Sequence, residues 1–208
     1  MPQPPSPLAA LAGFALTALL AWSVATPADA RVRVKERTTF YSVSGKDGRA
    51  IYRSIRRRGP AARRGHAVAS TTTRTTVRNL RAGVRGRRCV IESFDVDIDI
   101  TYRLPRWRGD RRASRRVRRA WKEFAARARR HENEHGRISK LYAKRLERAL
   151  RRVSDGVSRG CRNFERKALR TFEKVQQDAD RRHARFDRRE GRMLSRTTRI
   201  QRALYSAN

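Results

Sequence analysis

The spacing of apolar residues changes near residue 110, from alternation to a helical period. In residues 89–102 apolar side chains alternate with polar ones, and three aspartates, Asp95, Asp97 and Asp99, share the polar face. This alternation predicts a strand that is buried on one side. Residues 114–154 contain no Pro and a single Gly, and their apolar residues recur every three or four positions, which predicts a long helix.

Shorter elements are expected in the N-terminal half. Val32 and Val34 alternate with charged residues, and residues 66–80 are rich in Thr and Val. Both segments are therefore predicted as strands. Residues 50–58 are predicted as a short helix that the following Gly-Pro pair ends.

The C-terminal half is predicted to form an antiparallel helical hairpin. Asp155 and Gly156 are expected to end the first helix, and a second helical pattern runs from residue 161 to about 186. We therefore expect an α+β fold in which a β-rich N-terminal half packs on a long C-terminal helical hairpin. A single domain is predicted at residues 31–190, followed by a polar, basic tail at 191–208.

The first thirty residues are typical of an export signal. Residues 8–25 form an almost unbroken apolar run, and Ala28, Asp29 and Ala30 have the small-x-small pattern of a cleavage site. The usual Lys or Arg is missing before the run, and an uncleaved membrane anchor is the alternative, because about twenty apolar residues can span a bilayer. We expect a signal peptide at 1–30, cleavage after Ala30, a periplasmic or secreted protein, and no stable membrane insertion afterwards.

The composition is strongly basic, with 53 Lys and Arg residues against 19 Asp and Glu and a formal net charge of +34. Only seven of the basic residues are lysines, and the arginines are spread along the chain rather than gathered in a block. A nucleic-acid-binding tail is usually compact, so no specific nucleic-acid partner is expected. Non-specific binding to anionic polymers is compatible with this charge.

The two cysteines, Cys89 and Cys161, are most simply one disulfide in an exported protein, since they lack the spacing of a zinc site.

The long predicted helix contains the sequence His131-Glu132-Asn133-Glu134-His135. Residues i and i+4 share a helix face, so His131 and His135 can both bind one Zn²⁺ ion. Glu132 would then act as general base on a zinc-activated water. The two histidines lie on the apolar stripe, whereas Glu134 points in another direction and is expected in solvent or behind the ligands. A solvated helix face that matches the motif by chance is the alternative.

A zinc hydrolase of this kind needs a third protein ligand. In an antiparallel hairpin that turns at 155–160, residue 133 lies opposite residue 182, so His183 would lie beside the histidine pair. Asp187 follows four residues later on the same face, and either side chain can reach the metal. His183 is slightly preferred. His66 is expected at the edge of a strand, away from the site.

Several motifs of the chain occur together in one bacterial family. They are Tyr41-Ser42-Val43-Ser44-Gly45, Arg58-Gly59-Pro60, a Cys89-led strand ending in Ile100-Thr101-Tyr102-Arg103-Leu104-Pro105-Arg106-Trp107, Trp121-Lys122-Glu123-Phe124, the His131–His135 motif, Cys161, and His183-Ala184-Arg185-Phe186-Asp187. With these motifs the chain resembles the predicted secreted zinc-dependent proteases of domain of unknown function 922. The resemblance covers most of the chain after residue 30 and implies export and zinc-dependent proteolysis.

One motif departs from the family pattern. The family's closing stretch typically reads Tyr-Asp-x-x-Thr-x-His-Gly, and Phe186-Asp187 matches its opening. Glu190, Gly191 and Arg192 stand where Thr, x and His would be. The role of that later histidine cannot be carried over, which leaves His183 or Asp187 as the third ligand or implies a metal-impaired member.

The sequence therefore predicts a secreted zinc-dependent metalloprotease that hydrolyses peptide bonds in a peptide or protein substrate. The alternative from another class is a non-catalytic basic envelope protein that binds anionic polymers or a protein partner.

Overall fold

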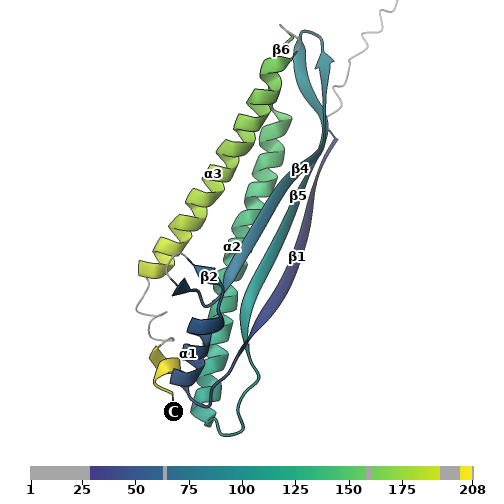
Figure 1. The fold of residues 1–208 in the computed structure, drawn as a ribbon. Coiled ribbons are helices and arrows are strands. Elements are labelled where there is room, and N and C mark those ends of the chain that lie inside the picture. Colours follow the sequence, from purple (N-terminus) through teal and green to yellow (C-terminus); the bar gives the residue numbers. More distant parts are fainter. Residues whose placement is uncertain (1–28, 63–64, 158–160, 193–201, 208) are drawn as a thin grey trace, which may run out of the picture.

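A computed structural model describes residues 29–62, 65–157, 161–192 and 202–207. The apolar run at 8–25 and most of the predicted signal peptide lie outside the described residues. Long strands and two long helices lie side by side and give the molecule an elongated shape (Figure 1). The predicted α+β fold is confirmed, since the sheet belongs to the N-terminal half and the long helices to the C-terminal half.

The main sheet has three long strands, β1 (Asp29–Val43), β4 (Ser70–Arg85) and β5 (Arg88–Trp107). Their order is β1-β5-β4, so β5 is central and β1 and β4 are the edges. β1 runs parallel to β5, and β4 forms an antiparallel hairpin with it. A short strand, β6 (Ser154–Gly156), pairs with the start of β5, and β2 (Ala61–Ala62) and β3 (Gly65–His66) form a separate small ribbon.

The alternation predicted for the central strand is confirmed. Apolar side chains of β5 are buried on the face that packs on the helices, and Asp95 and Asp97 form ion pairs with Arg33 and Arg78 of the edge strands. β5 ends at Trp107, within the predicted end at residues 104–107, and contains Pro105. The strand tolerates this proline because β4 begins opposite Arg103, so that β5 has only β1 as a partner beyond that point.

Three helices were expected and lie close to the predicted positions: α1 (Gly48–Arg58), α2 (Arg115–Arg151) and α3 (Arg162–Arg192). Ser114 caps α2 by accepting a hydrogen bond from the backbone N–H of Val117. The predicted end of α2 at Asp155 and Gly156 is wrong, because these residues leave the helix to pair with β5. α3 extends six residues beyond the predicted end near 186.

The main core lies between β5 and the helical hairpin, where Phe94, Ile98, Leu146 and Phe164 are almost completely buried. The predicted disulfide is confirmed: Cys89 of β5 and Cys161 at the start of α3 are bonded, with their Cα atoms 5.9 Å apart. The bond ties the central strand to the hairpin turn. A disulfide is compatible with a location outside the cytoplasm.

A second apolar cluster closes the other end of the molecule, around α1 and the start of α2. Two residues of the predicted polar tail, Leu204 and Ala207, are fully buried in this cluster. The backbone N–H of Gly48 donates a hydrogen bond of 2.7 Å to the carbonyl of Ala207. The tail therefore contributes to the fold, which its polar, Arg-rich sequence does not indicate. Within the part of the chain that the structure describes, no helix is long and apolar enough to cross a membrane.

Gly136, next to His135 in α2, allows the sheet to approach the helix closely. A Cβ atom at this position would lie 1.9 Å from Oη of Tyr102 and 2.8 Å from its ring. We expect Gly136→Ala to destabilise the protein by about 1–3 kcal/mol, because the buried Tyr102 ring has to move. Thermal or denaturant unfolding measures this change.

The matched control for this substitution is Gly191→Ala in α3. A Cβ atom at Gly191 would meet nothing within 4 Å. Ala favours a helix over Gly by about 1 kcal/mol, so this variant is expected to be as stable as the wild type or more so. Equal stabilities of the two variants would contradict the proposed packing at Gly136.

Candidate metal centre

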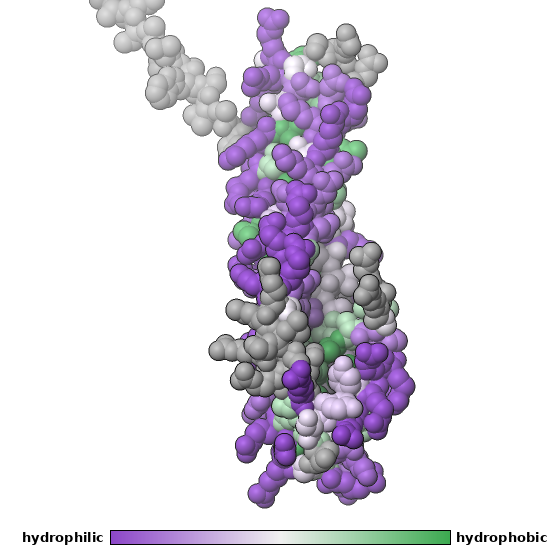
Figure 2. Space-filling model, turned by 90° about the vertical axis from the view of Figure 1, so that its left-hand side faces the viewer, coloured by the Kyte–Doolittle hydropathy of each residue, from purple (hydrophilic) through white to green (hydrophobic). Residues whose placement is uncertain are grey.

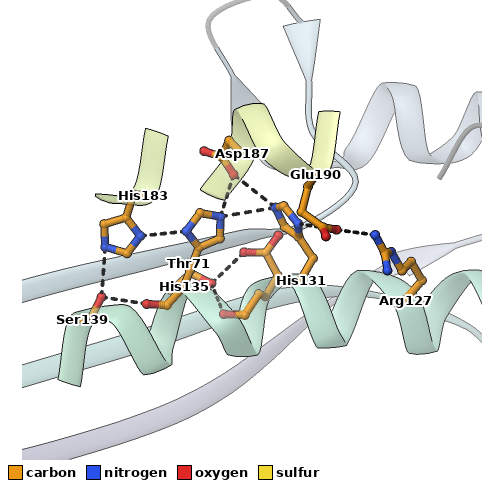
Figure 3. Close-up of polar contacts among 9 residues, drawn as sticks. Thr71, Arg127, His131, His135, Ser139, His183, Asp187 and Glu190 are labelled. Carbon is orange, nitrogen blue, oxygen red and sulfur yellow. Dashed lines mark hydrogen bonds and ion pairs between the residues drawn. The ribbon is translucent and has the colours of Figure 1, made fainter. Parts of the chain in front are cut away.

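The two motif histidines lie on the face of α2 that looks towards α3. Nε2 of His131 and Nε2 of His135 are 3.2 Å apart. Oδ1 of Asp187, from α3, lies 3.0 Å from Nε2 of His135 and 3.4 Å from Nε2 of His131 (Figure 3). Within the described residues, these three form a group whose donor atoms lie close enough together to bind one metal ion.

The triangle formed by these atoms has the dimensions of one face of a zinc tetrahedron. Zn²⁺ binds His nitrogen and carboxylate oxygen at about 2.0–2.2 Å, so tetrahedral geometry holds two ligand atoms about 3.3 Å apart. The observed separations of 3.0, 3.2 and 3.4 Å lie around this value. Two imidazoles and one carboxylate also match the ligand set of catalytic zinc sites, which leave a fourth position open. The residues therefore fit a zinc ion.

His183 lies on the other side of His135. Nδ1 of His183 is 2.8 Å from Nδ1 of His135, and its Nε2 is 3.4 Å from Oγ of Ser139. The Ser139 hydroxyl lies 3.1 Å from the backbone carbonyl of His135. These contacts hold the ring of His135 with Nε2 directed at Asp187. This geometry favours Asp187 over His183 as the third ligand, the reverse of the slight preference drawn from the sequence.

Burial changes the pKa values of two of these histidines. Burial lowers the pKa of His135, although the nearby Asp187 carboxylate opposes the effect. Burial also lowers the pKa of His183, and the neighbouring His135 lowers it further. Neutral imidazole is the form that binds metals, so the lowered pKa of His135 favours ligation at neutral pH.

Glu132 is buried between α2 and the edge strand β4, with only 5% of its surface exposed. The hydroxyl of Thr71 donates a hydrogen bond of 2.6 Å to Oε2 of Glu132. Burial raises the pKa of the Glu132 carboxyl, while the hydrogen bond from Thr71 and the nearby His131 lower it. A carboxylate with a raised pKa is a stronger base, which is the property required of a general base.

A second carboxylate stands behind His131. Oε2 of Glu190 lies 3.9 Å from Nδ1 of His131 and forms a close ion pair with Arg127. A carboxylate behind a metal-binding histidine orients the ring and increases its basicity. Figure 3 shows Glu190 and Asp187 projecting from α3 towards the histidines of α2. Glu134 lies apart from this arrangement and pairs with Arg137.

These side chains line an open pocket of about 470 Å³. One wall is formed by α2 and α3, and the other by Ala69, which precedes β4, and by Ser70, Thr71 and Thr73 at its start. The pocket gives a ligand access to the donor atoms and to Glu132 at the same time. His66, on the short strand β3, is exposed and does not contribute to this pocket, as expected.

The hairpin register predicted from the sequence is close to the observed one. The prediction places residue 180 opposite His135, and the observed neighbour is His183, a difference of three residues. Glu190 was not predicted, although its position three residues after Asp187 puts it on the same helix face. Thr71 could not be found in this way, because its position depends on how β4 packs on α2.

The fold and the site together define an α+β protein with an HExxH helix in a hairpin and a candidate metal centre against the edge of a mixed sheet. The chain matches DUF922, described as a bacterial protein of unknown function, over residues 38–193, and it belongs to this family. No curated protein matches the chain. No solved structure matches it either.

Proposed function

We propose that this protein is an exported zinc-dependent peptidase that hydrolyses peptide bonds. The observation that carries the proposal is the set of three donor atoms from His131, His135 and Asp187, 3.0–3.4 Å apart, beside the buried carboxylate of Glu132. A chance match of the motif on a solvated helix face would not require a carboxylate from a second helix at this position. The site opens into a pocket, as an enzyme requires for its substrate.

Zinc in such a site supplies Lewis acidity, which makes water a nucleophile at neutral pH and polarises the carbonyl that it attacks. Glu132 is placed to accept a proton from the attacking water and to deliver it to the leaving amine. The hydrogen bond from Thr71 fixes the orientation of the Glu132 carboxylate. His183, Ser139 and Glu190 position the rings of the two ligand histidines.

The predicted export fits this activity. The Cys89–Cys161 disulfide forms in oxidising compartments such as the periplasm. The signal peptide at 1–30 and cleavage after Ala30 remain part of the proposal. Mass spectrometry of the protein isolated from its own cells tests them, since the expected N-terminus is Arg31.

We expect the zinc-loaded protein to cleave unfolded casein. Removal of zinc with a chelator abolishes cleavage, and added zinc restores it, because His131, His135 and Asp187 form the binding site. His131→Ala is expected to be inactive, whereas His66→Ala, at the exposed histidine of β3, retains full activity. Casein cleavage that persists in the chelator or in His131→Ala would contradict the proposal.

A further inference from the structure

A second pocket follows the candidate metal centre along the same seam between β4 and α3. It has a volume of about 460 Å³ and is lined largely by apolar side chains, including Val77 and Leu80 of β4 and Ala168, Leu169 and Phe172 of α3. Two of these side chains are strongly exposed, Leu80 to 43% and Leu169 to 58%. Seen from the α3 side, the molecule is mostly hydrophilic and has only small hydrophobic areas (Figure 2).

The two pockets lie in order along both elements. On β4 the first is lined by Ser70, Thr71 and Thr73, and the second begins at Thr75. On α3 the lining passes from Asp187 to Phe172 and Leu169. The separation along α3 between Asp187 and these two residues is about 22–27 Å at 1.5 Å per residue. An extended peptide covers this distance with about seven or eight residues at ~3.3 Å each. We call the two pockets together the β4–α3 groove.

The groove follows the backbone edge of β4. Thr75, Thr76 and Val77 all line the second pocket, although neighbouring residues of a strand point to opposite faces. Only a pocket at the edge of the strand is lined by three consecutive residues. Among the described strands, β4 pairs with β5 alone. The other edge of such a strand presents backbone groups with which an added extended peptide can pair.

The charge of the groove differs from that of the rest of the protein. The chain contains 53 Lys and Arg residues, yet none of the described residues that line the two pockets is Lys or Arg. The charged side chains outside the proposed ligand and base set are two carboxylates, Glu165 and Asp180. Charge complementarity therefore favours a cationic segment in the groove and disfavours an acidic one.

We propose that the β4–α3 groove selects the substrate of this enzyme. It binds an extended, cationic peptide segment along β4 and takes up one apolar side chain in the second pocket, about seven or eight residues from the cleaved bond. Lys and Arg are preferred to Asp and Glu between these two points, because Asp180 lies on this path and Glu165 lies at its far end. The inference rests on the proposed peptidase activity and adds the substrate class.

The test uses labelled peptides of about twelve residues, long enough to span the groove at ~3.3 Å per residue. Each contains one Leu at a varied position in an Ala/Lys or an Ala/Glu background. We expect cleavage about seven or eight residues from the Leu, and faster cleavage in the Lys background. Leu169→Lys is expected to lower kcat/KM for these peptides about tenfold without loss of zinc, because it places a charge in the apolar pocket.

The control is Leu141→Lys, at a leucine of α2 that is 40% exposed and does not line either pocket. It is expected to cleave the peptides as the wild type does. Cleavage without a fixed distance from the Leu, or equal effects of the two variants, would overturn the groove assignment and leave the peptidase proposal intact.

Binding of the same labelled peptides to the Glu132→Gln protein, measured by fluorescence anisotropy, separates the groove proposal from the peptidase proposal. If the wild type cleaves no peptide, and Leu169→Lys added to the Glu132→Gln protein weakens peptide binding, the groove assignment is supported and the peptidase activity is refuted. Absence of both cleavage and binding would refute both.

Discussion

Glu132→Gln is expected to lower the rate of peptide hydrolysis by about 10²–10⁴-fold while zinc stays bound, because the side chain acts as general base and not as a ligand. The amide oxygen of Gln can still accept the hydrogen bond from Thr71, so the local structure is retained. The measurement is kcat with an unfolded protein substrate, together with the zinc content of the same sample.

Glu134→Gln is the matched control, since Glu134 belongs to the same motif but pairs with Arg137 on the surface. This variant is expected to have wild-type activity. Full activity of Glu132→Gln would show that Glu132 is not the general base. Loss of zinc from this variant would show that Glu132 is instead part of the metal site.

The second large effect concerns the third ligand. Asp187→Ala is expected to weaken zinc binding more than His183→Ala, because Oδ1 of Asp187 lies 3.0 and 3.4 Å from the two histidine Nε2 atoms. His183 contacts the opposite nitrogen of His135, and loss of such a supporting contact typically costs 10–100-fold in metal affinity. Competition with a chromogenic zinc chelator measures both affinities.

His183→Gln serves as a milder control, because its amide can replace one hydrogen bond of the imidazole. It is expected to bind zinc better than His183→Ala. If His183→Ala loses more affinity than Asp187→Ala, His183 is the ligand and the side chains rearrange when the metal binds.

The sequence predicts the helical part of the site well, because the positions of these side chains depend on residue spacing within one helix and across one hairpin. The spacing of His131 and His135 fixes their common face, and a simple hairpin about the turn places His183 and Asp187 nearby. The choice between these two depends on side-chain direction, which a register argument does not contain. In the structure the ring of His183 contacts His135 and Ser139, and Asp187 is the residue that lies beside Nε2 of His135.

The strand side of the site is harder to predict for a physical reason. β1 and β5 are parallel and far apart in sequence, and the position of β4 over Glu132 follows from the packing of the whole sheet on α2. Thr71 lies in a Thr-rich segment in which no single residue stands out. The burial of Leu204 and Ala207 could not be predicted for a similar reason, since a few apolar residues in a polar, Arg-rich segment leave no periodic pattern.

Zinc content is the most direct test of the central claim that His131, His135 and Asp187 form a metal site. Protein with an intact disulfide, loaded with zinc and dialysed, is analysed by mass spectrometry for metals beside His131→Ala. We expect one zinc ion per chain in the wild type and almost none in the variant. Absence of zinc from the wild type, or equal zinc in both proteins, would contradict the account.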